Sequence, residues 1–396
     1  MNGYLVLEDG TIFKGTGFGS AGSAGNAGSA GSAGNAGNAG NAGNTGSDAG
    51  SDAGSDAGNA ETKCGEVVFT TGMVGYPESL TDPSYKGQIL VMTYPLVGNY
   101  GIPGDERKDN LLKYFESDRI QVQGLIVADY PDPDSYSHWN AEKSLSDWMR
   151  EHNIPGIYGV DTRELTKKLR EKGTMLGKIV YDERSINNTN FEDFTRKNLV
   201  AEVSVKKPVL YRNGKKRIMI IDCGVKNSII WAFIRRNISV IRRPWNYDFS
   251  KEMTDGVVIS NGPGDPKMCK ETIENVRKVL SKNVPILGIC LGSQILALAA
   301  GADTYKLKYG HRSQNQPCVE VGTRRCYITT QNHGYAVDSD TLPEDWREWF
   351  YNNNDGTNEG IVHISKPFFG TQFHPEASPG PDDTEFIFDV FLRAMR

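Results

Sequence analysis

The second half of the chain alternates short apolar segments with longer amphipathic ones, and this alternation restricts the fold more than any other feature. Strands alternating with helices of about 10–15 residues form βαβ units and a parallel sheet. Near-continuous apolar strands such as VVIS at 257–260 are typical of a sheet that is covered on both faces. The pattern predicts a doubly wound α/β domain over 217–396, with strands at Arg217–Asp222, Ser239–Arg242, Gly256–Ser260, Pro285–Ile289 and Phe368–Phe373 and helices at Asn227–Arg236, Glu271–Ser281 and Asp383–Met395.

The first half has a different pattern. Tyr4–Leu7 and Thr11–Lys14 flank a Glu-Asp-Gly turn, as in a β-hairpin. Asn140 can cap a helix over Ala141–His152, and Asp161 can cap a second one over Thr162–Lys172 that Gly173 would end. Further strands are predicted at Glu66–Thr70, Gln88–Tyr94 and Gln121–Ala128. We therefore expect an α+β domain over 1–205, joined by a linker at 206–216 to the second domain.

Residues 20–60 consist almost entirely of Gly, Ala, Ser, Asn and Asp in short repeats. Such small polar residues bury too little apolar area to offset the entropy of ordering the backbone. We expect a disordered insert between two strands, which the fold can tolerate because closure entropy grows only slowly with loop length.

Composition excludes several classes of function. The 396 residues carry 44 basic and 49 acidic side chains, for a net charge of −5, so we expect no nucleic-acid partner. No apolar stretch approaches the roughly 18 residues of a membrane span, and the N-terminus does not resemble a signal peptide, so we expect no membrane partner. The six cysteines form no C-x-x-C pair. We expect free thiols in a reducing cytoplasm and no metal site.

Cys290 lies where a predicted buried strand turns into a predicted helix. Gly288 and Gly292 flank it at G-x-C-x-G spacing, the arrangement of a nucleophile elbow with Cys in place of Ser. Such a turn projects the side chain from the carboxyl edge of a parallel sheet, where ligands bind. The helix N-terminus favours a thiolate and leaves the N–H of Leu291 free to donate to an oxyanion. Cys290 is a candidate nucleophile, whereas an isolated cysteine is more often a small core residue.

The candidate base is His374, which ends another predicted apolar strand and is followed by Pro375 and Glu376. Glu376 can accept a hydrogen bond from the imidazole and fix its tautomer. Cys290, His374 and Glu376 would then form a thiol triad, although His-Pro-Glu alone is equally typical of a surface turn. The other possible bases, which lack a carboxylate at such short spacing beside a strand end, are His311, His333 and His363.

A rigid loop rich in glycine and proline follows the strand at Gly256–Ser260. It reads NGPGDP over 261–266, so its backbone can approach a ligand closely. The N–H of Gly262 or Gly264 could supply a second oxyanion donor. Taken alone, such a segment is more often an ordinary turn.

Three segments in this order resemble the class I glutamine amidotransferases: NGPGDP at 261–266, GICLGSQ at 288–294 and QFHPEASPGP at 372–381. The segments at 71–90, 93–101 and 160–173 resemble the N-terminal domain of the small subunit of carbamoyl-phosphate synthetase. The likeness covers nearly the whole chain except 20–60 and is closest to the pyrimidine-pathway form. It implies an α+β domain followed by a doubly wound, mostly parallel amidotransferase domain.

The resemblance also implies a reaction. Cys290 would attack the side-chain amide of L-glutamine and form a thioester, His374 would transfer protons, and Glu376 would orient His374. Ammonia would pass to a synthetase partner, either a large subunit or a fused domain, that uses ATP, Mg²⁺ and bicarbonate. This chain has no G-x-x-x-x-G-K-[ST] loop, and no cofactor of its own is expected. Glutamine contacts, including the oxyanion donors Leu291 and Gly262, would come from Ser84, Gly262, Gly264, Leu291, Gln294, Asn332, Gly334 and Tyr335.

Two positions depart from the family pattern. Ser293 stands where the family usually has His, and Ser313-Gln314 stands where it tends to have Gly-His or Gly-Gly. Two other readings stay open: a stand-alone glutaminase or related enzyme with the same triad, and a silent regulatory subunit. The first domain, with DPSY at 82–85, argues against the former reading, and the intact triad argues against the latter.

Overall fold

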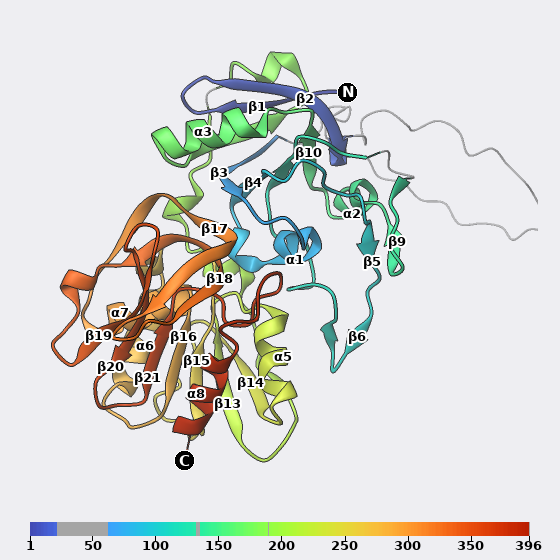
Figure 1. Ribbon diagram of the computed structural model, residues 1–396. Helices are drawn as coiled ribbons and strands as arrows, with labels where there is room; N and C mark the ends of the chain where they lie inside the picture. Colours follow the sequence, from blue (N-terminus) through green and yellow to red (C-terminus); the bar gives the residue numbers. More distant parts are fainter. Residues whose placement is uncertain (22–61, 132–134, 189, 396) are drawn as a thin grey trace, which may run out of the picture.

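The computed structural model describes residues 1–21, 62–131, 135–188 and 190–395. Two β-sheets organise this part of the chain, a closed barrel and a ten-stranded sheet. In Figure 1 the barrel lies above the ten-stranded sheet, with helix α1 (Tyr76–Thr81) and the tips of β17 (Thr304–Glu320) and β18 (Cys326–Val337) at the junction. Within the described ranges, no helix is both long enough and apolar enough to cross a membrane.

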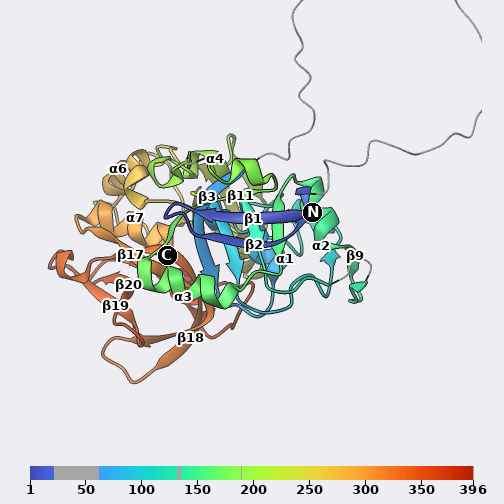
Figure 2. The same ribbon diagram turned by 90° about the horizontal axis from the view of Figure 1, so that it is seen from above.

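The barrel closes in the order β1-β11-β3-β4-β8-β10-β2. Its apolar interior comes from alternate residues such as Leu5, Val67, Ile89 and Ile126, all with no exposed surface. Helices α2 (Leu145–Glu151) and α3 (Thr162–Lys172) pack outside it, as Figure 2 shows. The strands are β1 (Asn2–Leu7), β2 (Ile12–Gly19), β3 (Lys63–Thr70), β4 (Gln88–Met92), β8 (Gly124–Ile126), β10 (Pro155–Tyr158) and β11 (Met175–Val180).

Most predicted elements of the first half are present. The hairpin forms as β1 and β2, and the Asp161 side chain caps α3 while Gly173 ends it with φ 100°. The helix predicted over Ala141–His152 begins later, because Ser144 rather than Asn140 caps it and 141–143 form strand β9 (Ala141–Lys143). Residues 22–60 of the predicted insert lie outside the described residues. The remaining short elements are β5 (Ile102–Pro103), β6 (Arg107–Lys108), β7 (Leu111–Leu112), α4 (Val200–Val203) and 3₁₀ turns at Pro83–Tyr85, Glu183–Ser185 and Phe194–Arg196.

The ten-stranded sheet is parallel at its centre. Five strands run parallel in the order β14-β13-β15-β16-β21, and antiparallel strands extend both edges. The predicted strands and helices of this half all form, within a few residues of the expected ends. They are β13 (Arg217–Asp222), α5 (Asn227–Arg235), β14 (Ser239–Pro244), β15 (Gly256–Ile259), α6 (Lys270–Val279), β16 (Ile286–Ile289), α7 (Leu291–Ala300), β21 (Phe368–Thr371) and α8 (Phe386–Ala394).

Helices cover both faces of this sheet, as the apolar strands predict. On one face α5 and α8 pack through Phe233, Phe388 and Phe391. On the other face α6 and α7 pack through Val276 and Ile295. The fold is therefore doubly wound, and the carboxyl ends of the central strands meet at one edge.

Two features differ from the expectation. Residues 209–211 of the predicted linker form β12 (Val209–Tyr211), which pairs with the edge strand β14 and so belongs to the sheet. The other edge is extended by β17, β18, β19 (Trp346–Asn352) and β20 (Asn358–His363), which were not predicted. The β17–β18 ribbon reaches the barrel, since Thr71 N–H donates to the Arg312 carbonyl.

Candidate active site

Cys290 sits on a strained turn between β16 and α7. It is the N-cap of α7 and has a backbone φ of 54°, a value that residues other than glycine rarely adopt. A Cβ at Gly288 would lie 2.5 Å from the Gly292 carbonyl oxygen, and a Cβ at Gly292 would lie 2.0 Å from that of Ile259. Both flanking glycines are thus required by close backbone packing. The elbow predicted from the sequence is present.

His374 and Glu376 lie beside this turn and are almost fully buried. Nδ1 of His374 is 2.6 Å from Glu376 Oε1, while its Nε2 has no hydrogen-bond partner in the described residues. Burial alone would lower the pKa of His374, but Glu376 and Cys290 outweigh that effect and raise it to about 10. The structure therefore brings the three predicted triad residues together.

Lys226 supports Glu376 and was not predicted. Its Nζ lies 3.1 Å from Glu376 Oε1 and donates to the Ala377 carbonyl at 2.6 Å. Burial would raise the pKa of Glu376, but Lys226 and His374 lower it to about 2. Lys226 lies beyond the carboxyl end of β13, the sheet edge where ligands bind, and that position was the available signal.

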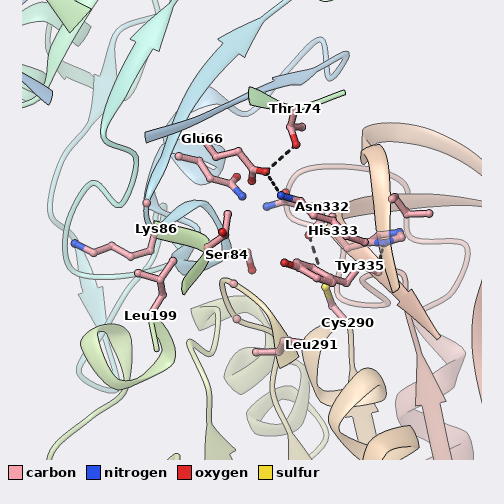
Figure 3. A pocket seen from close by; sticks show the side chains of 18 of the residues that line it. Glu66, Ser84, Lys86, Thr174, Leu199, Cys290, Leu291, Asn332, His333 and Tyr335 are labelled. Carbon is pink, nitrogen blue, oxygen red and sulfur yellow. Dashed lines mark hydrogen bonds and ion pairs between the residues drawn. The ribbon is translucent and has the colours of Figure 1, made fainter. Parts of the chain in front are cut away.

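A pocket opens onto Cys290, and all eight predicted glutamine contacts line it. Figure 3 shows Cys290 and Leu291 at one end of this pocket and Glu66 and Thr174 at the other. The N–H groups of Leu291 and Gly262 have no acceptor among the described residues. A Cβ at Gly262 would lie 2.0 Å from the Cys223 carbonyl oxygen, so this loop also requires glycine. The predicted contacts that line it are Ser84, Gly262, Gly264, Leu291, Gln294, Asn332, Gly334 and Tyr335.

The barrel domain supplies part of this site. Ser84 Oγ accepts a hydrogen bond from Asn261 Nδ2 at 2.9 Å. Asp82, which was not predicted, accepts one from Asn332 Nδ2 at 3.0 Å. Gln294 Nε2 donates to the Tyr335 carbonyl at 2.8 Å. Polar side chains of the first domain therefore fix the pocket loops of the second.

Glu116 forms a second link between the domains. Helix α5 begins after Lys226 without a side-chain cap of its own. Instead, Glu116 Oε2 accepts from the Ser228 N–H at 3.0 Å and from Ser228 Oγ at 2.7 Å, and the Glu116 carbonyl accepts from the Asn227 N–H at 2.9 Å. Glu116 also bonds the Ser378 hydroxyl, two residues after Glu376. The first domain therefore caps the helix that presents Lys226.

Arg312 brings a buried guanidinium to the pocket that forms no ion pair within the described residues. Its side chain is 5% exposed, one amino group donates to the Tyr309 carbonyl at 2.8 Å, and Nε has no hydrogen-bond partner in the described residues. The nearby carboxylate of Glu66 is ion-paired with Lys306 at 2.7 Å instead. Burial lowers the pKa of Arg312, although Glu66 and Tyr85 oppose this. A buried guanidinium without a paired anion suits a ligand with a carboxylate.

The two departures from the family pattern lie near the site but outside the triad. Ser293 is buried beneath the elbow and packs against Gly370. A Cβ added to Gly370 would lie only 2.5 Å from Ser293 Oγ. Gln314 donates to the Val74 carbonyl at 2.7 Å and thereby bridges the domains. The alternative bases face other carboxylates: His311 pairs with Asp355 and Glu359, and His363 with Asp345.

Two family models match the chain. The model described as glutamine amidotransferase class-I matches residues 219–394. The model described as carbamoyl-phosphate synthase small chain, CPSase domain, matches residues 47–179. The first match covers most of the ten-stranded sheet, and the second covers the barrel strands from β3 to β11 but not β1 and β2.

Curated relatives agree with these matches. The chain is 51% identical over 364 residues to the multifunctional protein pyr-3 of Neurospora crassa, covering 84% of this chain but only 20% of that protein. It is 52% identical over 336 residues to the carbamoyl phosphate synthase arginine-specific small chain of Neurospora crassa, covering 83% of this chain and 74% of that one. The corresponding small chain of Saccharomyces cerevisiae is 51% identical over 342 residues, covering 83% and 82%.

The near-equal identities do not separate the multifunctional from the arginine-specific relatives, so the pathway stays a prediction. The small-chain matches nevertheless span most of both chains at about half identity. The chain belongs to the carbamoyl-phosphate synthase small-chain family, and its second half is a class I glutamine amidotransferase domain.

Proposed function

We propose that this chain hydrolyses L-glutamine through a Cys290–His374–Glu376 triad and delivers the ammonia to a synthetase that makes carbamoyl phosphate. One observation carries the proposal. Cys290 lies on a strained elbow that faces a pocket. Beside it lies His374, whose Nδ1 contacts the Glu376 carboxylate and whose Nε2 has no hydrogen-bond partner within the described part of the chain. This is the arrangement of an activated thiol nucleophile.

In the first step His374 Nε2 takes the proton of the Cys290 thiol, and the sulfur attacks the side-chain amide carbon of glutamine. The N–H groups of Leu291 and Gly262, which lack other acceptors in the described residues, would hold the oxyanion. His374, protonated at Nε2, passes that proton to the departing amide nitrogen and releases ammonia. A γ-glutamyl thioester remains on Cys290.

In the second step His374 accepts a proton from water, which attacks the thioester and frees glutamate. Glu376 fixes the Nδ1–H tautomer of His374, and Lys226 keeps Glu376 ionised in its buried position. The Arg312 guanidinium would face the α-carboxylate of the substrate.

The partner is proposed from the family. The ammonia would go to a carbamoyl-phosphate synthetase large subunit or to a synthetase domain in the same polypeptide. That partner would bind the ATP, Mg²⁺ and bicarbonate, and we place the reaction in the cytoplasm.

The test measures ammonia release from glutamine by the chain alone, and then with a synthetase subunit, bicarbonate and ATP. We expect strong stimulation by the partner and loss of all release in Cys290→Ser. Cys326→Ser, which removes an exposed thiol, serves as the matched control and should remain active. Release that survives in Cys290→Ser would refute the mechanism. High activity of the chain alone, without stimulation by the partner, would indicate a stand-alone glutaminase. Inactivity both alone and with the partner would indicate a silent subunit.

A further inference from the structure

Behind the glutamine pocket, three buried side chains from three strands converge. His311 comes from β17, His333 from β18 and Glu359 from β20. Glu359 Oε1 lies 3.2 Å from His311 Nδ1 and 3.8 Å from His333 Nε2. One donor atom from each residue falls within 4.8 Å of the other two. The cluster lies outside the proposed triad.

The outer nitrogen of each imidazole is already engaged. His333 Nδ1 lies 2.8 Å from the Tyr335 carbonyl oxygen, and His311 Nε2 lies 2.8 Å from Asp355 Oδ2. Because a carbonyl oxygen only accepts, Nδ1 of His333 carries the hydrogen. Metal-bound histidines in proteins characteristically donate their outer N–H to a carbonyl or a carboxylate in this way.

The inner nitrogen of His333 faces only oxygen. It lies 3.1 Å from Gln331 Oε1, because the amide nitrogen of Gln331 donates to Thr329 Oγ1 and Cys318 Sγ instead. A lone pair on this nitrogen would therefore point at oxygen lone pairs unless a proton or a cation lies between them.

Glu359 supplies an independent observation. Its side chain is fully buried, and its Oε2 has no hydrogen-bond partner in the described residues. An unpartnered carboxylate oxygen at such a depth costs free energy unless a cation or a donor reaches it. Asp355, whose side chain is 46% exposed, borders the cluster on its solvent side.

We propose that His311, His333 and Glu359 bind a divalent first-row metal ion, Zn²⁺ foremost. Two histidines and one glutamate form a common Zn²⁺ ligand set, with ligand atoms about 2.0–2.2 Å from the ion. Ligand atoms around such an ion lie a little over 3 Å apart, so small side-chain rotations would close the set.

The site would act on substrate binding through position. His333 lies between Asn332 and Gly334, two predicted glutamine contacts, and Figure 3 shows it beside Asn332 and Tyr335 at the pocket wall. A bound ion would tie this segment of β18 to β17 and β20. The sequence predicted no metal site because the three ligands come from three separate strands and have no characteristic spacing.

The experiment strips the full chain with a chelator, equilibrates it with Zn²⁺ or Co²⁺, and measures bound metal and the visible absorption of the Co²⁺ form. We expect one equivalent in the wild type, a raised melting temperature, and at least about tenfold weaker binding in His311→Asn and in Glu359→Gln. His363→Asn is the matched control, because His363 is a buried histidine of β20 that pairs with Asp345 alone among the carboxylates of the described residues.

Equal binding in all variants, or no binding by the wild type, would overturn the proposal. Should Glu359→Gln fail to fold, His311→Asn still decides the question, since its ring borders the solvent-exposed Asp355. Running every sample in a Cys326→Ser background removes the exposed thiol as an adventitious ligand. Metal content is read without glutamine, so this result is independent of the proposed glutaminase activity.

Discussion

Replacing Glu116 by alanine should lower the free energy of unfolding of the chain and reduce kcat for ammonia release at Cys290. The Glu116 carboxylate is buried at the domain junction and accepts hydrogen bonds from the Ser228 N–H, the Ser228 hydroxyl and the Ser378 hydroxyl. Alanine leaves all three donors unpaired. It also removes one of the negative charges that raise the pKa of Lys226 against the effect of burial.

The magnitude follows from these contacts. A net contribution of about 1.5–3 kcal/mol for each of the three hydrogen bonds would overstate the cost of the variant, because burial raises the pKa of Glu116 and opposes its charge. Removing one member of a buried charge network typically costs about 3–5 kcal/mol, and we expect Glu116→Ala to fall in that range. Glu116→Gln keeps an acceptor for Ser228 and should cost about 1–2 kcal/mol.

Two assays check this reasoning. Urea denaturation gives the stability change, and ammonia release gives kcat and KM for glutamine. Because Glu116 supports Lys226 and the loop after Glu376 but does not line the pocket, kcat should fall roughly 10–100-fold, with KM changed far less. Glu106→Ala, an exposed glutamate paired with Lys113 in the same domain, should change stability by less than about 0.5 kcal/mol. Wild-type stability and kcat in Glu116→Ala would refute the argument.

Three further variants probe other parts of the structure. Gly292→Ala should abolish ammonia release, because the new Cβ would lie 2.0 Å from a backbone oxygen, and a fully active, folded variant would contradict the elbow geometry. Burial raises the pKa of Glu78 from 4.5 to about 7. Between about pH 4.5 and 7 the folded state therefore keeps a proton on Glu78 that the unfolded state has lost, so the free energy of unfolding falls as pH rises through that window. Glu78→Gln should remove this pH dependence and, in urea titrations at pH 8, be more stable than wild type by up to about 3 kcal/mol. An unchanged pH dependence would contradict the raised pKa of Glu78. Arg312→Met should raise KM for glutamine about 10–100-fold with a smaller change in kcat, and an unchanged KM would show that the guanidinium does not face the substrate.

The sequence predicted the parts of the site that backbone geometry dictates. Gly288 and Gly292 flank Cys290 at a strand-to-helix turn where a Cβ at either glycine would meet backbone atoms, so their spacing was informative. Lys226 and Glu116 act through contacts between segments far apart in the chain, and their spacing carried no signal. The strand β17 was missed because buried polar residues such as His311 and Arg312 interrupt its apolar pattern. In physical terms, residues that serve a polar site break the periodicity from which strands are predicted.

The pairing of β16 with β21 has a consequence for how the chain acquires activity. Cys290 follows β16, and His374 follows β21, which lies next to it in the sheet although it is made about 80 residues later. Insertion of β21 between β16 and β20 completes the sheet. The same event places the imidazole beside the thiol. A partly folded or nascent chain would therefore carry a cysteine without its imidazole, and under the proposed mechanism glutamine hydrolysis would begin only once the last central strand has docked.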